Sequence, residues 1–226
     1  MDPHDILNKL DALIQSRSIL RHPFYVAWRE GTLTKTQLAT YARMYWPHVA
    51  AFPSYLEANM EKTADPVIRE TLARNLHDER TNPKPHPELW LDFATSLGQS
   101  RQEVTAAAPH RSARHIVNTF RRLATSSTLE GVTALYAYEV QQPEVASQKR
   151  DGLRTHYGIT GGESLTYFNV HAEADIAHSQ EERDVLRHCL GDSGEPGIVI
   201  NAATESLNAY WELLDGVCEQ TNISMN

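Results

Sequence analysis

The sequence has 226 residues, enough for one sizeable domain or two small ones. Its 21 basic and 29 acidic residues give a formal net charge of -8, which argues against a nucleic-acid or anionic-membrane partner held by bulk electrostatics. The two cysteines, Cys189 and Cys218, are too far apart for a disulfide framework or a cysteine zinc site. Because neither a signal peptide nor a transmembrane stretch is recognisable, we expect a cytoplasmic protein.

Apolar residues recur three and four positions apart along nearly the whole chain, which is the spacing of one face of an α-helix. The segment Thr34-Lys35-Thr36-Gln37 has the pattern of a capping box and predicts the start of a long helix. Pro47 and Pro53 lie inside that helix and should kink or break it. Asp65-Pro66 is an N-cap followed by proline at the first helical position, which predicts a helix over about 66–80.

The same spacing predicts further helices on both sides of these. They are expected after Pro3, after His22-Pro23 as far as Gly31, from about Glu88 to Leu97, at about 110–125, at about 128–149 with Pro143 inside, from about Glu163 to Leu190, and at about 198–220. Three prolines within 83–87 exclude a helix there, Gly191–Gly197 is predicted to be a loop, and residues 221–226 should fray. Since no alternating strand pattern occurs, the sequence predicts a single all-α domain over residues 1–226, with about seven to nine helices.

The strongest chemical signal is the segment 171–178, His-Ala-Glu-Ala-Asp-Ile-Ala-His. At about 100° per residue, His171, Asp175 and His178 point within roughly 60° of one another on a helix. Two imidazoles and one carboxylate then converge, and these ligands suit iron, manganese or zinc. Glu173 projects from the opposite side and is expected to lie in solvent. Taken by itself, the spacing fits a histidine-rich surface helix equally well.

Three residues elsewhere extend this set. Glu139 lies in the largely apolar helical stretch 134–140, where an unpaired carboxylate would be costly to bury. Glu79 ends a predicted helix, and prolines on both sides of His86 restrict its backbone. A partly exposed glutamate and an ordinary surface loop are the alternatives for these positions. Together, three carboxylates and three imidazoles match the inventory of a dinuclear carboxylate site in a helical bundle, and they nearly balance the charge of two divalent ions.

These six residues occur in an order that resembles the metal-binding pattern of the haem-oxygenase-like di-metal oxidases. The order is Glu79-x6-His86, then Glu139, then His171-x3-Asp175-x2-His178. Within that group the sequence is most similar to the family of the chlamydial protein associating with death domains, from Arg21 through the helix that carries His178. More distant relatives with this fold are the cofactorless pyrroloquinoline quinone synthase C family and the thiaminase-II-like proteins. Neither is expected to have the complete pattern.

The resemblance implies a haem-oxygenase-like helical bundle that binds two transition-metal ions, Fe/Fe or Fe/Mn, and uses molecular oxygen and an external reductant. It also implies a homodimer that makes para-aminobenzoate, a folate precursor, by excising the ring of one of its own tyrosines. The matching positions are Tyr25 as the sacrificed residue and Lys149 as the donor of the amino group. Tyr41, Tyr138 and Tyr167 match family tyrosines near the site, which could relay electrons or replace Tyr25 as substrate.

The residue pattern alone selects neither Tyr25 nor Lys149. Tyr25 is beside Phe24 and Trp28 at helical spacing and is expected in the core, whereas Lys149, beside Arg150, resembles a solvated charge. As a nucleophile Lys149 must be neutral, so burial or nearby metal charge should lower its pKa. Three other functions remain open: the same centre oxidising an exogenous small molecule, an interaction protein for death-domain partners, and a haem-degrading enzyme, although six ligands would fill the porphyrin's space.

Overall fold

The computed structural model describes residues 2–191 and 195–224, and within these ranges the chain forms helices and no strands. In chain order the helices are α1 (Pro3–Ser16), η1 (Ile19–Arg21), α2 (Pro23–Glu30), α3 (Lys35–Lys62), α4 (Pro66–Thr81), α5 (His86–Ser96), α6 (Arg101–Thr105), α7 (Arg111–Ser126), α8 (Thr128–Glu139), α9 (Gln142–Tyr157), η2 (Gly162–Leu165), α10 (Thr166–Leu190) and α11 (Pro196–Thr221). The prediction of an all-α protein is confirmed.

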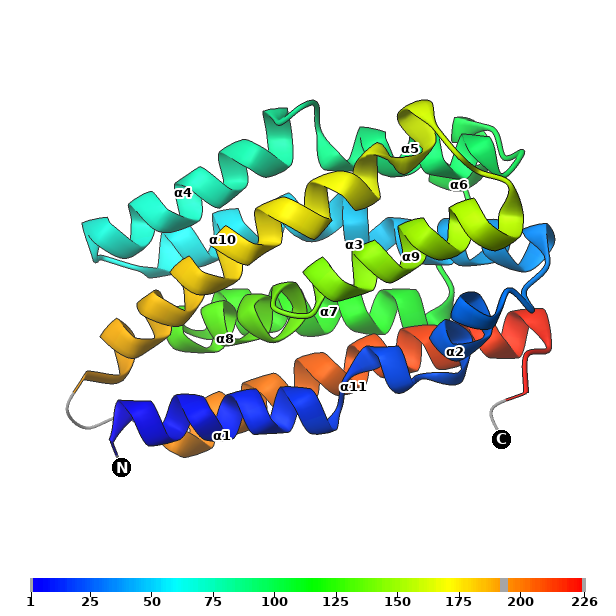
Figure 1. Ribbon diagram of the computed structural model, residues 1–226. Coiled ribbons are helices and arrows are strands. Elements are labelled where there is room, and N and C mark those ends of the chain that lie inside the picture. Colours follow the sequence, from blue (N-terminus) through cyan, green and yellow to red (C-terminus); the bar gives the residue numbers. More distant parts are fainter. Residues whose placement is uncertain (1, 192–194, 225–226) are drawn as a thin grey trace.

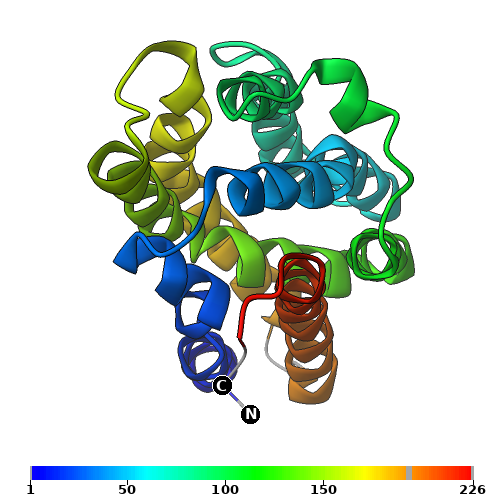
Figure 2. The ribbon, with the colours of Figure 1, turned by 90° about the vertical axis from the view of Figure 1, so that its right-hand side faces the viewer.

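The long helices run roughly along one direction and form an elongated bundle (Figure 1). Seen from one end, α3 and α8 lie near the middle, with α1, α9, α10 and α11 around them (Figure 2). Residues 131–139 of α8 are all buried, because α7, α10 and α11 pack against different sides of this helix. A residue at the end of α8 therefore projects into the protein interior.

The predicted helix starts are formed by local hydrogen bonds. The Thr34 hydroxyl accepts a hydrogen bond from the Gln37 N–H at 3.2 Å, and the Gln37 side chain accepts one from the Thr34 N–H at 2.8 Å, which completes the capping box. The Asp65 side chain accepts from the N–H of Val67 at 2.8 Å and caps α4. Gly31 ends α2 in a left-handed conformation, with φ of 69°.

Pro47 and Pro53 do not break the helix that contains them, and Pro143 lies at the start of a helix and not inside one. The 28-residue helix α3 continues through Pro47 and Pro53, so the predicted break is absent; neighbouring helices α4, α5 and α7 pack along it and hold it together. The predicted helix over 128–149 is divided into α8 and α9. Pro143 occupies the first turn of α9, where its missing N–H needs no intrahelical partner.

The predicted end at 149 is also wrong, because α9 continues for about two more turns to Tyr157. Most other boundaries differ by one or two residues or one turn. Helix α5 begins at His86, the first turn of the predicted 163–190 helix is the 3-10 helix η2, and the short helix α6 was not predicted. The predicted loop over Gly191–Gly197 and the predicted fraying of 221–226 fall partly on residues 192–194 and 225–226, outside the described part of the chain. None of the helices in the described ranges has the length and hydrophobicity needed to cross a membrane.

Candidate metal centre

The six predicted ligands come from four helices and meet in the interior. They are Glu79 on α4, His86 at the start of α5, Glu139 at the end of α8, and His171, Asp175 and His178 on α10. All six are buried, and none is more than 6% exposed. Their ligand atoms form two groups, within each of which the atoms lie within 4.8 Å of one another: the first cluster, Glu79, His86 and His171, and the second cluster, Glu139, Asp175 and His178.

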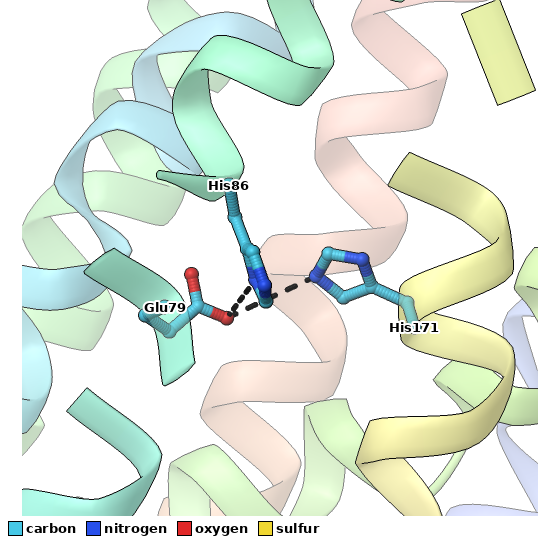
Figure 3. Close-up of side chains that lie close together, drawn as sticks. All are labelled: Glu79, His86 and His171. Carbon is cyan, nitrogen blue, oxygen red and sulfur yellow. Dashed lines mark ion pairs between the residues drawn. The ribbon is translucent and has the colours of Figure 1, made fainter. Parts of the chain in front are cut away.

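In the first cluster, both imidazoles turn one nitrogen toward Glu79 (Figure 3). His86 Nδ1 lies 2.8 Å and His171 Nε2 lies 3.8 Å from Glu79 Oε1. The other nitrogen of each ring faces a backbone carbonyl: His86 Nε2 that of Asn82 at 3.1 Å, and His171 Nδ1 that of Tyr167 at 2.7 Å. Because a carbonyl can only accept, it fixes the proton on that nitrogen and leaves the nitrogen that faces Glu79 with a free lone pair.

The second cluster has the same arrangement with a carboxylate in place of the carbonyl. His178 Nε2 faces Asp78 Oδ2 at 3.1 Å, and its Nδ1 lies 3.5 Å from Asp175 Oδ1 and 3.6 Å from Glu139 Oε2. The Asn75 side-chain amide donates to both oxygens of Glu139, at 3.1 and 3.2 Å. All three histidines are therefore oriented by an outer partner, which is the usual feature of histidine ligands in metal sites.

Several of these ligand atoms are buried without a donor to satisfy them. Asp175 Oδ2 has no hydrogen-bond partner among the described residues, and His86 Nδ1 and His178 Nδ1 face carboxylate oxygens, which cannot donate to their lone pairs. A buried lone pair without a donor is costly, and a bound cation removes that cost. Imidazole and carboxylate together suit iron or manganese. The residues thus fit two transition-metal ions, one in each cluster.

The charges of the second cluster are strongly coupled. Burial, together with the nearby Asp175 carboxylate, raises the pKa of Glu139 to about 8. Burial lowers the pKa of His178, but the nearby carboxylates of Asp175 and Glu139 outweigh it and raise that pKa to about 10. In the first cluster, burial raises the pKa of Glu79, but His86 and the other histidines outweigh it and lower that pKa. The second cluster therefore holds protons that metal ions would displace.

A small cavity adjoins both clusters. It is lined by Val49, Phe52, Glu79, Tyr138, Glu139, Tyr167, His171 and Asp175. The space open to a water-sized molecule is about 10 Å³, enough for about one water and far too small for an aromatic ring. A substrate beside the metal centre must therefore be very small or already part of the protein.

Tyr25 and Lys149 are both buried and lie against each other. Lys149 Nζ is 4.8 Å from the centroid of the Tyr25 ring and 5.4 Å from those of Tyr41 and Tyr45. Only 3% of Lys149 is exposed, so the interpretation of this residue as a solvated charge is wrong. Burial lowers the pKa of Lys149 well below its usual value, as expected for a nucleophilic amine. Tyr25 is a core residue, as its neighbours predicted.

Hydrogen bonds between hydroxyls connect the tyrosines. The Tyr25 hydroxyl lies 3.2 Å from that of Tyr41 and 3.3 Å from that of Tyr210. Tyr45 and Tyr138 form a second pair, at 2.8 Å, and the rings of Tyr138 and Tyr210 are 5.1 Å apart. A chain of phenols thus extends from Tyr138, at the cavity, to Tyr25. Sequence reasoning missed Tyr45 and Tyr210.

The remaining predicted tyrosine, Tyr167, lies at the first cluster. Its ring stacks on that of His171 with centroids 4.0 Å apart and also lines the cavity. Sequence reasoning also missed Asp78 and Asn75, which orient ligands, and Glu182, a buried glutamate one turn after His178. Glu182 alone had a signal in the sequence, because it continues the three-and-four spacing of the α10 ligands.

Residues 39–211 match the profile of the haem-oxygenase-like family described as iron-containing redox enzymes. The chain belongs to this family. Within it, the chain is 38% identical to the 4-aminobenzoate synthase of Nitrosomonas europaea, over 93% of the chain and 90% of that protein. It is also 38% identical to the 4-aminobenzoate synthase of Chlamydia trachomatis, over 93% of the chain and 91% of that protein. A pyrroloquinoline-quinone synthase from Acidiphilium cryptum is more distant, at 24% identity over 96% of the chain and 89% of that protein.

Solved structures confirm the predicted haem-oxygenase-like fold. A TenA homologue from Pseudomonas syringae superimposes with a TM-score of 0.81 at 19% identity, over 96% of this chain and 92% of that one. A CADD-like protein of unknown function from Nostoc punctiforme gives 0.80 at 16% identity, over 98% and 99%. At such low identity these structures bear on the fold alone.

Proposed function

We propose that the protein is an oxygen-dependent di-metal oxidase that makes para-aminobenzoate from its own tyrosine side chain. The names of the relatives at 38% identity support the product, and the family of iron-containing redox enzymes supports the metal chemistry. One observation carries the self-sacrificing part of the proposal. The buried amine of Lys149 lies over the ring of the buried Tyr25, in a core whose cavity at the metal centre is too small for an aromatic ring.

The two clusters would hold the metal ions, Fe/Fe or Fe/Mn. Bound there, the ions would supply oxygen activation with electrons from an external reductant. The protein's own contribution is to orient the ligands: carbonyls and Asp78 hold the three imidazole protons away from the centre, and Asn75 holds the Glu139 carboxyl. The walls of the cavity limit what else can approach.

Tyr25 and Lys149 would provide the atoms of the product. The ring and Cβ of Tyr25 supply the carbons of para-aminobenzoate, so the Cα–Cβ bond must break and Cβ must be oxidised to a carboxylate. Lys149 Nζ forms a bond to the ring carbon that carries the phenol oxygen, this oxygen leaves as water, and the Cε–Nζ bond of Lys149 must also break, with molecular oxygen as the oxidant. Because burial lowers the pKa of Lys149, its amine has the free lone pair that this replacement requires.

The phenol chain gives the metal centre a connection to Tyr25. Tyr138 lines the cavity, Tyr45 is hydrogen-bonded to Tyr138, and Tyr210 is hydrogen-bonded to Tyr25. Buried phenols with raised pKa values stay protonated, so each can give up an electron together with its proton. We also propose a homodimer, on the resemblance alone, and a cytoplasmic location.

Isotope labelling tests the proposal directly. Protein expressed with ring-¹³C-labelled tyrosine is loaded anaerobically with Fe(II) and Mn(II), then exposed to oxygen and a reductant without any added substrate. We expect ring-labelled para-aminobenzoate, at no more than about one molecule per chain. Unlabelled protein mixed with labelled free tyrosine is the control and should give unlabelled product.

Two outcomes would contradict different parts of the proposal. Unlabelled para-aminobenzoate from fully labelled protein would end the self-sacrificing part and leave an oxidase that acts on an external substrate. Fully metal-loaded protein that gave no para-aminobenzoate at all would end the assignment of the product.

A further inference from the structure

Glu182 lies on α10 four residues after His178 and is only 2% exposed. At about 100° per residue, its side chain projects about 20° from the direction of His171. It therefore belongs to the same narrow face of α10 as His171, Asp175 and His178. That face is directed to the metal centre, away from solvent.

The carboxyl group of Glu182 receives no hydrogen bond from any described residue. Neither of its oxygens has a hydrogen-bond partner among the described residues. Its neighbour is the carboxyl group of Glu139, which is within hydrogen-bonding reach, and Asp175 is near enough for its charge to act on Glu182. Glu139 itself is held by the Asn75 amide, whereas Glu182 has no such support. A carboxyl group buried in this way is costly unless a further partner binds it.

Acidic residues on the other faces of α10 are not buried. The preceding residue, Glu181, is partly exposed and pairs with Arg74 at 3.2 Å. Glu173 is exposed as well, as its position predicted. Glu182 differs from these residues because its position on the helix directs it inward, toward two other carboxyl groups.

The charge balance of the site also favours a fourth carboxylate at the metal centre. Two divalent ions carry a charge of +4, and Glu79, Glu139 and Asp175 together supply -3 when ionised. The fourth buried carboxylate, Glu182, brings the total to -4. A neutral sum matters in a buried site, because uncompensated charge there is costly.

We propose that Glu182 is a further metal ligand, whose carboxylate binds the ion held by Glu139, Asp175 and His178. This inference rests on the metal-binding part of the proposed function. The competing explanation is a protonated Glu182 that donates to Glu139. That bond would satisfy one oxygen of Glu182 and leave the other without a partner.

Anaerobic titration with Mn(II) alone distinguishes these two roles. The protein is stripped of metal, and binding is measured by equilibrium dialysis with elemental analysis, for wild type, Glu182→Gln and Glu173→Gln. We expect wild type and the exposed control Glu173→Gln each to bind about two ions, and the control to have the same affinities as wild type. Glu182→Gln should bind the first ion normally and the second at least about 10-fold more weakly.

Thermal unfolding of the metal-free proteins provides a second measurement and guards against misfolding. Gln has nearly the volume of Glu and removes one acidic group from a crowded set, so metal-free Glu182→Gln should be at least as stable as wild type. If Glu182→Gln folds and binds two ions as tightly as wild type, the assignment is overturned. If wild type itself binds no Mn(II), the metal centre and the Glu182 assignment both fail. Wild-type protein that binds Mn(II) as expected but makes no para-aminobenzoate in the labelling experiment would contradict only the proposed activity.

Discussion

A lysine enclosed by aromatic rings is unusual, because its ammonium form would lack both water and a carboxylate. The groups that face Lys149 Nζ are the rings of Tyr25, Tyr41, Tyr45 and Phe168. Cation–π attraction only partly replaces hydration, and burial lowers the pKa of Lys149 well below its usual value. Folding therefore favours the neutral amine, which is the reactive form.

This environment predicts a specific pH dependence of stability. The folded protein binds the Lys149 proton less tightly than the unfolded chain, so below the usual lysine pKa this residue destabilises the fold, and the effect shrinks as pH rises toward that value. Lys149→Met, of similar volume, should exceed wild type in stability at pH 7, with a smaller advantage at pH 10. Urea unfolding of the metal-free proteins measures this. The facing tyrosines stay protonated because burial raises their pKa values.

An advantage of Lys149→Met that stayed constant from pH 7 to pH 10 would contradict this prediction. It would mean that packing of the new side chain, and not loss of the titrating amine, causes the difference. Arg150→Met is a matched control, because Arg150 is only partly buried and pairs with Asp151 at 3.1 Å. Its effect on stability should not depend on pH in this range.

Tyr25→Phe tests the second residue of the pair. The substitution removes the hydroxyl and leaves the ring volume nearly unchanged, so the loss of two hydroxyl contacts should cost only about 1 kcal/mol of stability. Synthesis of para-aminobenzoate should fall to background, because the oxidisable phenol is gone. Tyr55→Phe, at another buried tyrosine, should retain synthesis. If Tyr25→Phe remains active and Tyr41→Phe does not, Tyr41 is the consumed residue.

At the scale of the helix, α10 supplies more of the candidate metal ligands than any other helix. Its narrow inward face carries three of the six predicted ligands and Glu182, and it packs against α4, α5 and α8, which supply the other ligands. Periodicity was sufficient to predict this face, because residues three and four positions apart on a helix must point the same way. It was also sufficient to predict the capping box of α3 and the N-cap of α4.

Other features depend on contacts between helices, which periodicity does not specify. The hydrogen bond between Tyr25 and Tyr210 joins residues 185 positions apart, and Asp78 reaches His178 from another helix. The burial of Lys149 is likewise a property of packing, because rings from α2, α3 and α10 surround its amine. For Tyr25 and Lys149, only the family resemblance indicated a role in advance.

Alanine substitutions along α10 test whether its inward histidines bind metal. His171→Ala and His178→Ala should each lower the metal content from about two ions per chain to about one, because each removes one ligand from a different cluster. The control is His188→Ala on the exposed side of the same helix, where the ring pairs with Asp65 at 2.8 Å. Elemental analysis after desalting gives the metal content. Far-UV circular dichroism should show unchanged helical content in all three variants.

A full complement of two ions in His171→Ala or His178→Ala would contradict this ligand assignment. A loss of both ions in one variant with unchanged helical content would indicate that the two clusters bind cooperatively. That second result would still place the substituted histidine in the metal centre.

At the scale of the whole molecule, the metal-free protein carries unfavourable charge in its core. Glu79, Glu139, Asp175 and Glu182 lie together in the interior with three histidines, and several of their ligand atoms have no hydrogen-bond partner among the described residues. Four helices meet at these residues: α4 and α8 end there, α5 begins there, and α10 passes through. Because the ligands converge only in the folded chain, metal ions should bind the folded state and not the unfolded one.

Metal ions should therefore stabilise the whole bundle. At a free Mn(II) concentration about 100 times the dissociation constant, preferential binding to the folded state contributes about 2.7 kcal/mol for one site. For a chain of this size that corresponds to a rise in Tm of roughly 5–10 °C, and two sites should give more. Anaerobic calorimetry with Mn(II) and with a chelator measures the difference. Mg(II), which binds imidazole poorly, should give a much smaller shift, and so should Mn(II) with the double variant His171→Ala/His178→Ala. Equal Tm values with Mn(II) and with chelator would mean that these buried carboxylates and histidines form a structural network that holds no metal.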